Sequence, residues 1–254
     1  MTDQYAALAS IYDRIGMNQF ARMHTPQLLT IAQQNEWLGR RILDLGCGTG
    51  APTLWFVSKG YSIQAVDRSP AMLAELEKAL VEMGQRHSVQ LIEADLRELP
   101  TALDPVDMVI SLDTMNALES LRDLEITFKR ISELMAPDKF FIFDMYTIEG
   151  LTQRGLSGDD MAFNADDLVV FRQNTYDYER SICTVDYHIF KHEDGEWQRH
   201  YTQRHLRAYP VQAVITLLKR YQFEVVQVLD AALRPFDLMT SHAPRLIYIM
   251  KKVA

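Results

Sequence analysis

The sequence has few of the features that mark specialised classes of protein. Cys47 and Cys183 are its two cysteines, too few for a disulfide framework or a cysteine-based zinc site. No apolar run reaches the roughly 18 residues that a membrane-spanning helix needs. The first ten residues, MTDQYAALAS, lack the basic flank and apolar stretch of a secretion signal. These absences predict a cytoplasmic protein that does not enter a membrane.

Positive charge is also scarce. The chain has 26 Lys and Arg against 34 Asp and Glu, a net charge of −8. Nucleic-acid-binding proteins usually display a basic face, because neutralising phosphates supplies much of the affinity. The longest basic feature here is Lys251-Lys252. We therefore expect a small molecule rather than a nucleic acid as the partner. His188 and His192 share one strand face, but without nearby cysteines or carboxylates they predict no metal site.

From residue 42 onward, short apolar runs alternate with helical segments. The runs that predict strands are 42–45, 62–67, 89–93, 106–112, 139–145, 224–229 and 245–250. Ser69-Pro70 places an N-cap and a first-turn proline before one intervening helix. The expected fold is α/β: a doubly wound, mostly parallel, seven-stranded Rossmann-like sheet.

Two regions depart from this alternation. Residues 1–41 are expected to be helical, with a second helix that begins at Thr25-Pro26 and ends at Gly39. After Tyr146 a polar loop with three glycines is expected, and residues 168–208 then predict successive strands. Asp194-Gly195 lies between two of these strands and is typical of a hairpin turn. The sheet thus carries an antiparallel β insertion after its fifth strand.

These patterns divide the chain into four parts. Residues 1–41 would form an N-terminal helical lid and 42–145 a cofactor-binding core. Residues 146–210 would form the β insertion, and 211–254 a closing helix with the last two strands. Within the insertion, residues 168–210 hold eight aromatic residues and six Lys and Arg against six Asp and Glu. This neutral, aromatic-rich segment suits either a cap over a small acceptor or a sheet that forms a homodimer.

The segment ILDLGCGTG (42–50) joins an apolar strand to three glycines. Glycines permit positive φ angles and close approach of a ligand to the backbone, beside the free N–H groups of the next helix. Their spacing is GxGxG rather than the GxGxxG of dinucleotide folds, so both hydride transfer and methyl transfer remain open at this point. Asp67 ends the next strand, where a carboxylate can accept both ribose hydroxyls. It could instead cap the following helix, although Ser69 is already placed to do so.

Four segments together resemble the class I S-adenosylmethionine-dependent methyltransferases. They are DLGCGTG, VDRSPAML, EADLRELP and MAPDKFFIFDMYT. In the last, Pro137-Asp138-Lys139 replaces the Pro-Gly-Gly that is common in the family, which alters a turn. YDRIG, SLDTMNAL and HLRAYP are similar to a bacterial small-molecule subgroup that includes sugar-amine and glycine N-methyltransferases. In that subgroup an N-terminal helix and an antiparallel insertion close over the cofactor pocket.

The resemblance implies S-adenosylmethionine as the cofactor and suggests residues that contact it. The glycine backbone would lie against the methionine portion, and Ser111 near the sulfonium. Arg22 would pair with the methionine carboxylate, unless it is a solvated helix arginine. The implied cofactor-binding residues are Asp44, Gly46, Cys47, Gly48, Gly50, Asp67, Arg68, Met72, Asp95, Leu96, Ser111, Tyr12 and Arg22.

Fewer residues are predicted to bind the methyl acceptor or to take part in the reaction. The resemblance places Tyr12, as a lid residue, with Asp113 and Tyr146 near the chemistry, and Asn116, Arg207 and Tyr209 in the substrate pocket. Asn116 could instead cap a helix, and Arg207 could pair on a strand face. The expected activity is transfer of a methyl group to the nitrogen or oxygen of a small metabolite by in-line displacement. A non-catalytic cofactor-binding module and an RNA methyltransferase are the alternatives.

Overall fold

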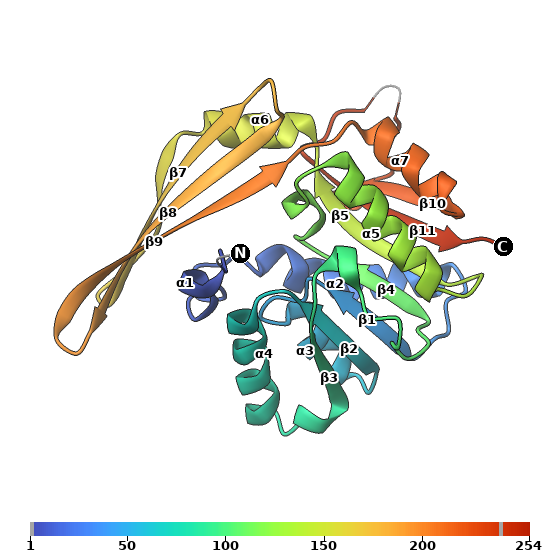
Figure 1. The fold of residues 1–254 in the computed structure, drawn as a ribbon, viewed down its shortest axis with the longest axis horizontal. Helices are drawn as coiled ribbons and strands as arrows, with labels where there is room; N and C mark the ends of the chain where they lie inside the picture. The colour runs from blue at the N-terminus through green and yellow to red at the C-terminus, as the bar shows by residue number, and fades with distance from the viewer. Residues whose placement is uncertain (1–2, 239–240) are drawn as a thin grey trace.

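The computed structural model describes residues 3–238 and 241–254. Figure 1 shows a twisted central sheet covered by helices, with a long β arm extending to one side. The sheet has seven strands in the order β10-β11-β5-β4-β1-β2-β3. Their bounds are β1 Arg41–Leu45, β2 Ser62–Asp67, β3 Val89–Glu93, β4 Met108–Ser111, β5 Phe140–Tyr146, β10 Phe223–Asp230 and β11 Arg245–Lys252.

The strand pairing confirms the expected α/β fold. Strands β1 to β5 pair in parallel, and β11 runs antiparallel between β5 and β10. Strand β5 is buried at six successive positions before Tyr146, as a strand covered on both faces must be. The chain order reverses beside β1, which leaves a crevice at the carboxyl ends of β1 and β4, the usual ligand position in such sheets.

Helices cover both faces of the sheet. On one face lie α5 (Leu121–Leu134) and α7 (Val211–Arg220), whose apolar side chains pack on β4 and β5. On the other lie α2 (Gln19–Gln34), α3 (Ala51–Ser58) and α4 (Pro70–Glu82). Helix α4 begins where Ser69-Pro70 predicts it, and the Ser69 hydroxyl accepts the Met72 N–H at 3.2 Å. Three short 3-10 turns, η1 (Arg86–Ser88), η2 (Leu96–Glu98) and η3 (Met115–Ala117), complete the core.

The expected boundaries of the second N-terminal helix are wrong. A short helix, α1 (Ala6–Ala9), comes first, and α2 then begins at Gln19, so Pro26 lies inside it. Thr25 is not its cap: the hydroxyl donates to the Ala21 carbonyl at 2.7 Å, one turn earlier. Burial of one face of the helix against the sheet outweighs the local preference for proline in a first turn.

The prediction of a loop after β5 is also wrong, because a helix, α6 (Ile148–Leu156), forms there. The Thr147 hydroxyl caps it by accepting the Gly150 N–H at 3.1 Å. Gly150 is needed for close packing, since a Cβ there would lie 1.8 Å from the Pro244 carbonyl oxygen. The two glycines within the helix therefore allow tight contacts with neighbouring segments rather than a flexible connection.

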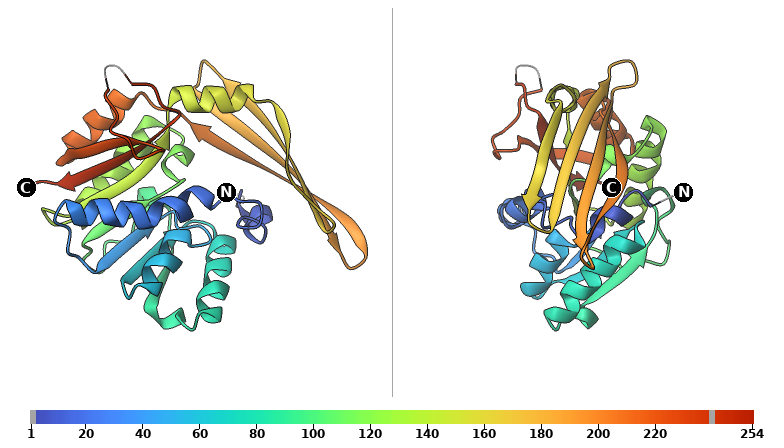
Figure 2. Two further views of the ribbon diagram at one scale, coloured as in Figure 1. Left: turned by 180° about the vertical axis from the view of Figure 1, so that it is seen from behind. Right: turned by 90° about the vertical axis from the view of Figure 1, so that its left-hand side faces the viewer.

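The insertion is a four-stranded antiparallel sheet whose first strand precedes the range 168–208 in which strands were expected. Its strands are β6 (Asp159–Ala165), β7 (Leu168–Asp177), β8 (Ile182–Glu193) and β9 (Glu196–Arg207), paired in that order. Asp194 and Gly195 both have positive φ, 52° and 83°, which confirms the expected hairpin. Figure 2 shows this arm as a thin curved sheet that extends well beyond the core.

The N-terminal segment lies between the arm and the core (Figure 1). Leu8, Ile11 and Tyr12 share an apolar cluster with Val185 and Leu206 of the arm. The two outer parts of the chain thus contact each other at the edge of the crevice. Within the described residues, no helix has the length and apolarity to cross a membrane.

Candidate active site

A cleft opens at the carboxyl ends of β1, β2 and β4. It contains about 970 Å³ of empty space, including the open solvent at its mouth. Most of the residues expected to hold the cofactor line this cleft: Tyr12, Asp44, Gly46, Cys47, Gly48, Asp67, Arg68, Met72, Asp95 and Leu96. Asp113 lines it as well.

The glycine turn forms one wall of the cleft. Gly46, Gly48 and Gly50 all have positive φ, 67°, 54° and 88°, which L residues other than glycine adopt at a cost. A Cβ at Gly48 would meet nothing within 4 Å, whereas one at Gly50 would lie 2.2 Å from a Leu76 methyl group. Gly48 thus leaves open space beside the backbone where a ligand can approach, and Gly50 lets α3 and α4 pack closely.

Asp67 is held in place by two backbone groups. Its carboxylate accepts the Gly48 N–H at 2.8 Å and the Ser69 N–H at 2.9 Å. Burial raises the pKa of Asp67, and these two hydrogen bonds oppose that rise. Each oxygen keeps a further lone pair. The carboxylate is therefore oriented, and it can still accept two hydroxyl groups of a ligand.

Asp95 already has a strong partner. Arg97 donates to both of its oxygens at 2.8 Å, and these hydrogen bonds lower the pKa of Asp95. Arg97 also lines the cleft and lies 3.5 Å from Asp123. Arg97 was not predicted, because in EADLRELP only the acidic residue and the leucine that follows it were assigned to the cofactor. The carboxylate of Asp95 and the guanidinium of Arg97 thus form a rigid polar part of the cleft wall.

Three expected cofactor residues do not line the cleft. Gly50 packs against Leu76. Ser111 is fully buried, and its hydroxyl donates to the Leu45 carbonyl at 2.7 Å, which ties β4 to β1. Arg22 is exposed on α2, but its charge acts on Asp13, which accepts a hydrogen bond from the cleft residue Thr49 at 2.6 Å.

Cys47 lies in the cleft wall with 5% of its surface exposed. Burial raises the pKa of its thiol, and Asp67 and Asp44 raise it further. A thiol that remains protonated is a poor nucleophile. Cys47 therefore lines the cleft as a small packing residue of the turn and not as a nucleophile.

A second cavity adjoins the cleft. It lies between α2, the arm and the carboxyl end of β5, and its lining includes Asn116, Tyr146, Arg204 and Arg245. Tyr12 and Asp113 line both the cleft and this cavity. The two spaces therefore meet at these two side chains.

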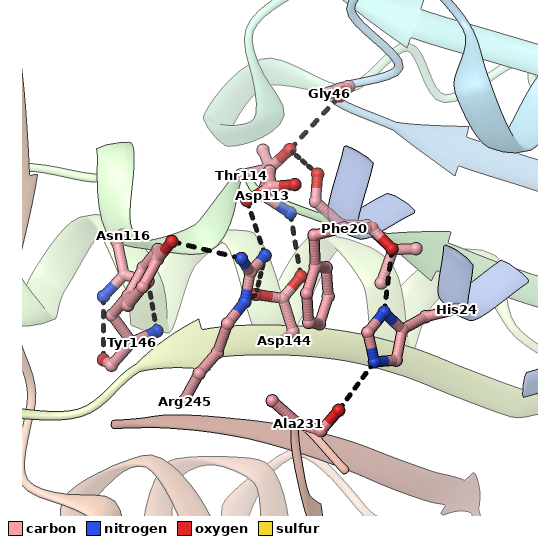
Figure 3. A network of polar contacts seen from close by, with 11 residues as sticks. Phe20, His24, Gly46, Asp113, Thr114, Asn116, Asp144, Tyr146, Ala231 and Arg245 are labelled. Atoms are coloured by element: carbon pink, nitrogen blue, oxygen red, sulfur yellow. Dashed lines mark hydrogen bonds and ion pairs between the residues drawn. The ribbon is translucent and has the colours of Figure 1, made fainter. Parts of the chain in front are cut away.

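Arg245 organises the floor of the second cavity (Figure 3). Its guanidinium contacts Asp144 at 2.6 Å and Asp113 at 2.5 Å. It is sandwiched between two rings, with its central carbon 3.2 Å from the centroid of Phe20 and 4.6 Å from that of Tyr146. The Asp113 N–H donates to Asp144 at 2.8 Å. This buried network fixes Asp113 and Tyr146 relative to each other.

Asp113 retains an unused acceptor. Its backbone has a φ of 59°, a conformation that aspartate tolerates better than most residues. One carboxylate oxygen, Oδ1, contacts Arg245, whereas Oδ2 is buried and has no hydrogen-bond partner among the described residues. A buried acceptor without a partner is costly, so Oδ2 is suited to receive a hydrogen bond from a ligand.

The three expected substrate residues lie in different places. Asn116 lines the second cavity, but its amide joins backbone groups of Tyr146 and Arg207 at 2.7 to 3.1 Å. Arg207 and Tyr209 line neither space; they bind the Glu119 and Leu118 carbonyls at 2.8 and 2.7 Å. Both brace the end of β9 against the segment after η3.

The sequence analysis missed several side chains that the fold brings to the second cavity. They are Phe20, His24, Arg154, Arg172, Arg204 and Arg245. His24 anchors α2 beside the cavity, with its ring nitrogens 2.8 Å from the Phe20 and Ala231 carbonyl oxygens (Figure 3). These six residues come from five separate elements, α2, α6, β7, β9 and β11, so no local spacing could have grouped them. No cluster of metal-ligating side chains occurs in residues 3–238 and 241–254.

Known proteins are similar to this chain over its core and over its whole length. The family described as a methyltransferase domain matches residues 42–138. YqeM of Bacillus subtilis, named as a methyltransferase, is 23% identical and aligns over 88% of each chain. An S-adenosylmethionine-dependent methyltransferase from Clostridium acetobutylicum shares the fold with a TM-score of 0.83 and 22% identity, over 99% of this chain and 100% of that one.

The arm is part of this likeness. The sugar N-methyltransferase KedS8 from Streptoalloteichus aligns with 97% of this chain and 93% of its own, with a TM-score of 0.76 and 15% identity. The matched domain spans the glycine turn, Asp67 and Asp95, which form the cleft described above. Residues 42–138 therefore form a methyltransferase domain, and the whole chain has the fold of the class I S-adenosylmethionine-dependent methyltransferases. These findings support S-adenosylmethionine as the cofactor.

Proposed function

We propose that this enzyme methylates the nitrogen or oxygen of a small metabolite that binds in the second cavity. The observation that carries this proposal is the shared position of Tyr12 and Asp113, which line both the cofactor cleft and the second cavity. In-line displacement requires the acceptor atom and the methyl group to meet on one line. A junction between the two spaces would allow the acceptor and the methyl group to meet in this way.

The cleft residues bind and orient the cofactor in this proposal. Asp67 accepts the ribose hydroxyls, while Met72 and Leu96 pack on the adenine beside Asp95 and Arg97. The backbone at Gly46 and Gly48 lies against the methionine portion, close to Asp44. When bound, S-adenosylmethionine supplies an activated methyl group on a positive sulfur.

Asp113 is the group placed to act on the acceptor. Its free Oδ2 would accept the N–H or O–H of the acceptor, turn the lone pair toward the cleft and receive the proton that is released. Tyr12 covers the junction from the lid side. Burial raises the pKa of its phenol, with Arg204 opposing and Asp113 adding to that rise, so Tyr12 remains a neutral hydrogen-bond donor.

We also propose the four-part division of the chain as a functional one. The segment 1–41 and the insertion 146–210 both supply walls of the second cavity, and 42–145 supplies the cofactor cleft. The segment 211–254, whose residues 239–240 lie outside the described structure, supplies Arg245. A lid and a cap of this kind would exclude water from the reacting atoms.

The outer part of the arm exposes Phe171, Trp197 and Tyr201, each between 45% and 54%. Exposed aromatic residues that share a surface often mark a protein contact, and we propose a homodimer through the arm. Sedimentation equilibrium of wild type and Trp197→Glu tests this: a dimer that dissociates in the variant supports it, and a monomeric wild type contradicts it.

The proposed function is tested by incubating the protein with methyl-labelled S-adenosylmethionine and a pooled metabolite extract. We expect the label in a product below about 1 kDa, the range of small ligands. Total RNA and a protein extract serve as parallel acceptors. Label found only in those, or in no product at all, would overturn the proposal.

A further inference from the structure

Four arginines line the second cavity, and two of them have ion-pair partners. Arg172 on β7 pairs with Asp160, and Arg245 on β11 pairs with Asp113 and Asp144. The other two are Arg154 on α6 and Arg204 on β9. The whole chain carries a net charge of −8, so this collection of cationic side chains is a local feature of the cavity.

Arg204 is the unusual member. Only 7% of it is exposed, its Nε has no hydrogen-bond partner, and no ion pair joins it to the described part of the chain. Its guanidinium carbon lies 5.0 Å from the centroid of the Tyr5 ring. Burying an arginine without an anionic partner is costly in free energy, and a fold that needed only packing here would place an apolar residue.

Arg154 adds a second donor with the same property. Its Nε is also buried without a partner in the described structure, and its guanidinium lies 5.8 Å from the centroid of the Tyr146 ring. Guanidinium groups bind oxyanions through two parallel hydrogen bonds. Two unpaired guanidiniums that face one cavity therefore form a site for an anion.

We propose that Arg204 and Arg154 bind a carboxylate of the methyl acceptor in the second cavity. This inference rests on the proposed function. The four guanidiniums of the cavity face three paired carboxylates, those of Asp113, Asp144 and Asp160, which leaves one positive charge. A carboxylate balances that charge, whereas a phosphate ester carries closer to two negative charges at neutral pH.

The free Oδ2 of Asp113 sets the direction of the bound acceptor. Asp113 lines both the cleft and the second cavity, so the reacting nitrogen or oxygen would lie beside it. The acceptor is therefore a small acid that also carries an amine or hydroxyl, with the donor group at Asp113 and the carboxylate at Arg204. The site would discriminate strongly against an analogue without the carboxylate, because Arg204 would then stay buried and unpaired.

The first measurement identifies the product that wild-type enzyme labels in the metabolite extract, by chromatography and accurate mass. A carboxylic acid is expected. A product with a phosphate ester and no carboxylate, or with no acidic group, would overturn this inference and leave the proposed function standing. An extract that yields no labelled small molecule would instead overturn the proposed function.

The second measurement uses Arg204→Gln, with Arg199→Gln as the control. Arg199 is on the same strand but exposed, so its replacement removes the same charge outside the cavity. For the labelled acceptor we expect Arg204→Gln to raise KM about 10- to 100-fold, the loss of one charged hydrogen-bonded pair. Affinity for S-adenosylhomocysteine should stay within about twofold. An unchanged KM would overturn the inference.

A third measurement needs no acceptor. Because Arg204 is buried without an anionic partner, Arg204→Met should leave the melting temperature of the ligand-free protein unchanged or raise it. A clear fall in melting temperature would show that Arg204 supports the fold and would overturn its assignment as a ligand-binding residue.

Discussion

The Gly48 N–H donates to the Asp67 carboxylate across 2.8 Å, which joins the turn after β1 to the end of β2. Because Ser69 donates to the other carboxylate oxygen, the carboxylate is oriented before any ligand arrives. The glycine turn and the acidic residue, far apart in the sequence, thus form one preorganised unit. A ligand that binds there does not have to order either part.

Replacing Asp67 should weaken cofactor binding. Asp67→Ala removes the acceptor for the ribose hydroxyls and for Gly48, and we expect a loss of about 1–3 kcal/mol in binding S-adenosylhomocysteine. Isothermal titration calorimetry measures this. Asp166→Ala, at an exposed turn of the arm, is the control. Equal affinity of wild type and Asp67→Ala would remove the ribose assignment.

The glycines at positions 48 and 50 should differ when each is replaced by alanine. Gly50→Ala combines a φ of 88° with a Cβ only 2.2 Å from Leu76, so we expect a loss of about 2–4 kcal/mol in the free energy of unfolding. In Gly48→Ala the new Cβ has no neighbouring atom within 4 Å. We expect this variant to lose about 1–2 kcal/mol in the free energy of unfolding and to bind the cofactor more weakly. Urea denaturation of both variants checks the order, which equal losses would contradict.

Removing Arg245 should destabilise the protein strongly. Arg245→Met leaves the buried Asp144 and the half-buried Asp113 without their cation, and breaking a buried ion pair costs about 3–5 kcal/mol. Arg234→Met is the control, because Arg234 pairs with Asp230 at 77% side-chain exposure and should cost less than about 1 kcal/mol. Similar denaturation midpoints for the two variants would show that the network is not stabilising.

The stability of the wild-type protein should fall between pH 4 and pH 7 because of Asp44. Burial raises the pKa of Asp44 to about 7, against the hydrogen bond from Thr53 that lowers it. In the unfolded chain this carboxyl loses its proton near pH 4, so over this window the folded state holds more protons and stability declines with pH.

Asp44→Asn removes that decline, and its amide oxygen can still accept the Thr53 hydroxyl, which lies 2.7 Å from Asp44. The stability of the variant relative to wild type should therefore rise from pH 4 to pH 8. Chemical denaturation at several pH values checks this prediction, and stability curves that stay parallel across the window would refute it.

Local signals predicted the core of the fold. The strands at 62–67 and 89–93 have the predicted bounds, because apolar runs between clear breakers define buried strands. Ser69-Pro70 marks the start of α4 for a similarly local reason. The same reading failed at Pro26 and at α6, where packing against distant segments decides the structure.

The cofactor cleft was largely predictable and the second cavity was not. The cleft is built from residues that follow directly after strands, as at Gly46 and Asp67, so sequence position places them. The second cavity depends on Arg204 and Arg245, which meet α2 and β5 only through the strand order and the path of the arm. Sequence position can also mislead. Ser111 ends a strand and was expected to contact the cofactor, but its hydroxyl forms a hydrogen bond that joins β4 to β1.

The central claim is that the methyl acceptor reacts from the second cavity across the junction at Tyr12 and Asp113. Ile15 is half-buried in the wall of that cavity but does not line the cofactor cleft, so Ile15→Trp fills one space and spares the other. The most direct measurement is transfer of labelled methyl to small molecules by Ile15→Trp, alongside its affinity for S-adenosylhomocysteine. We predict that transfer falls about 100-fold while that affinity stays within about twofold. Transfer equal to that of wild type would contradict the account.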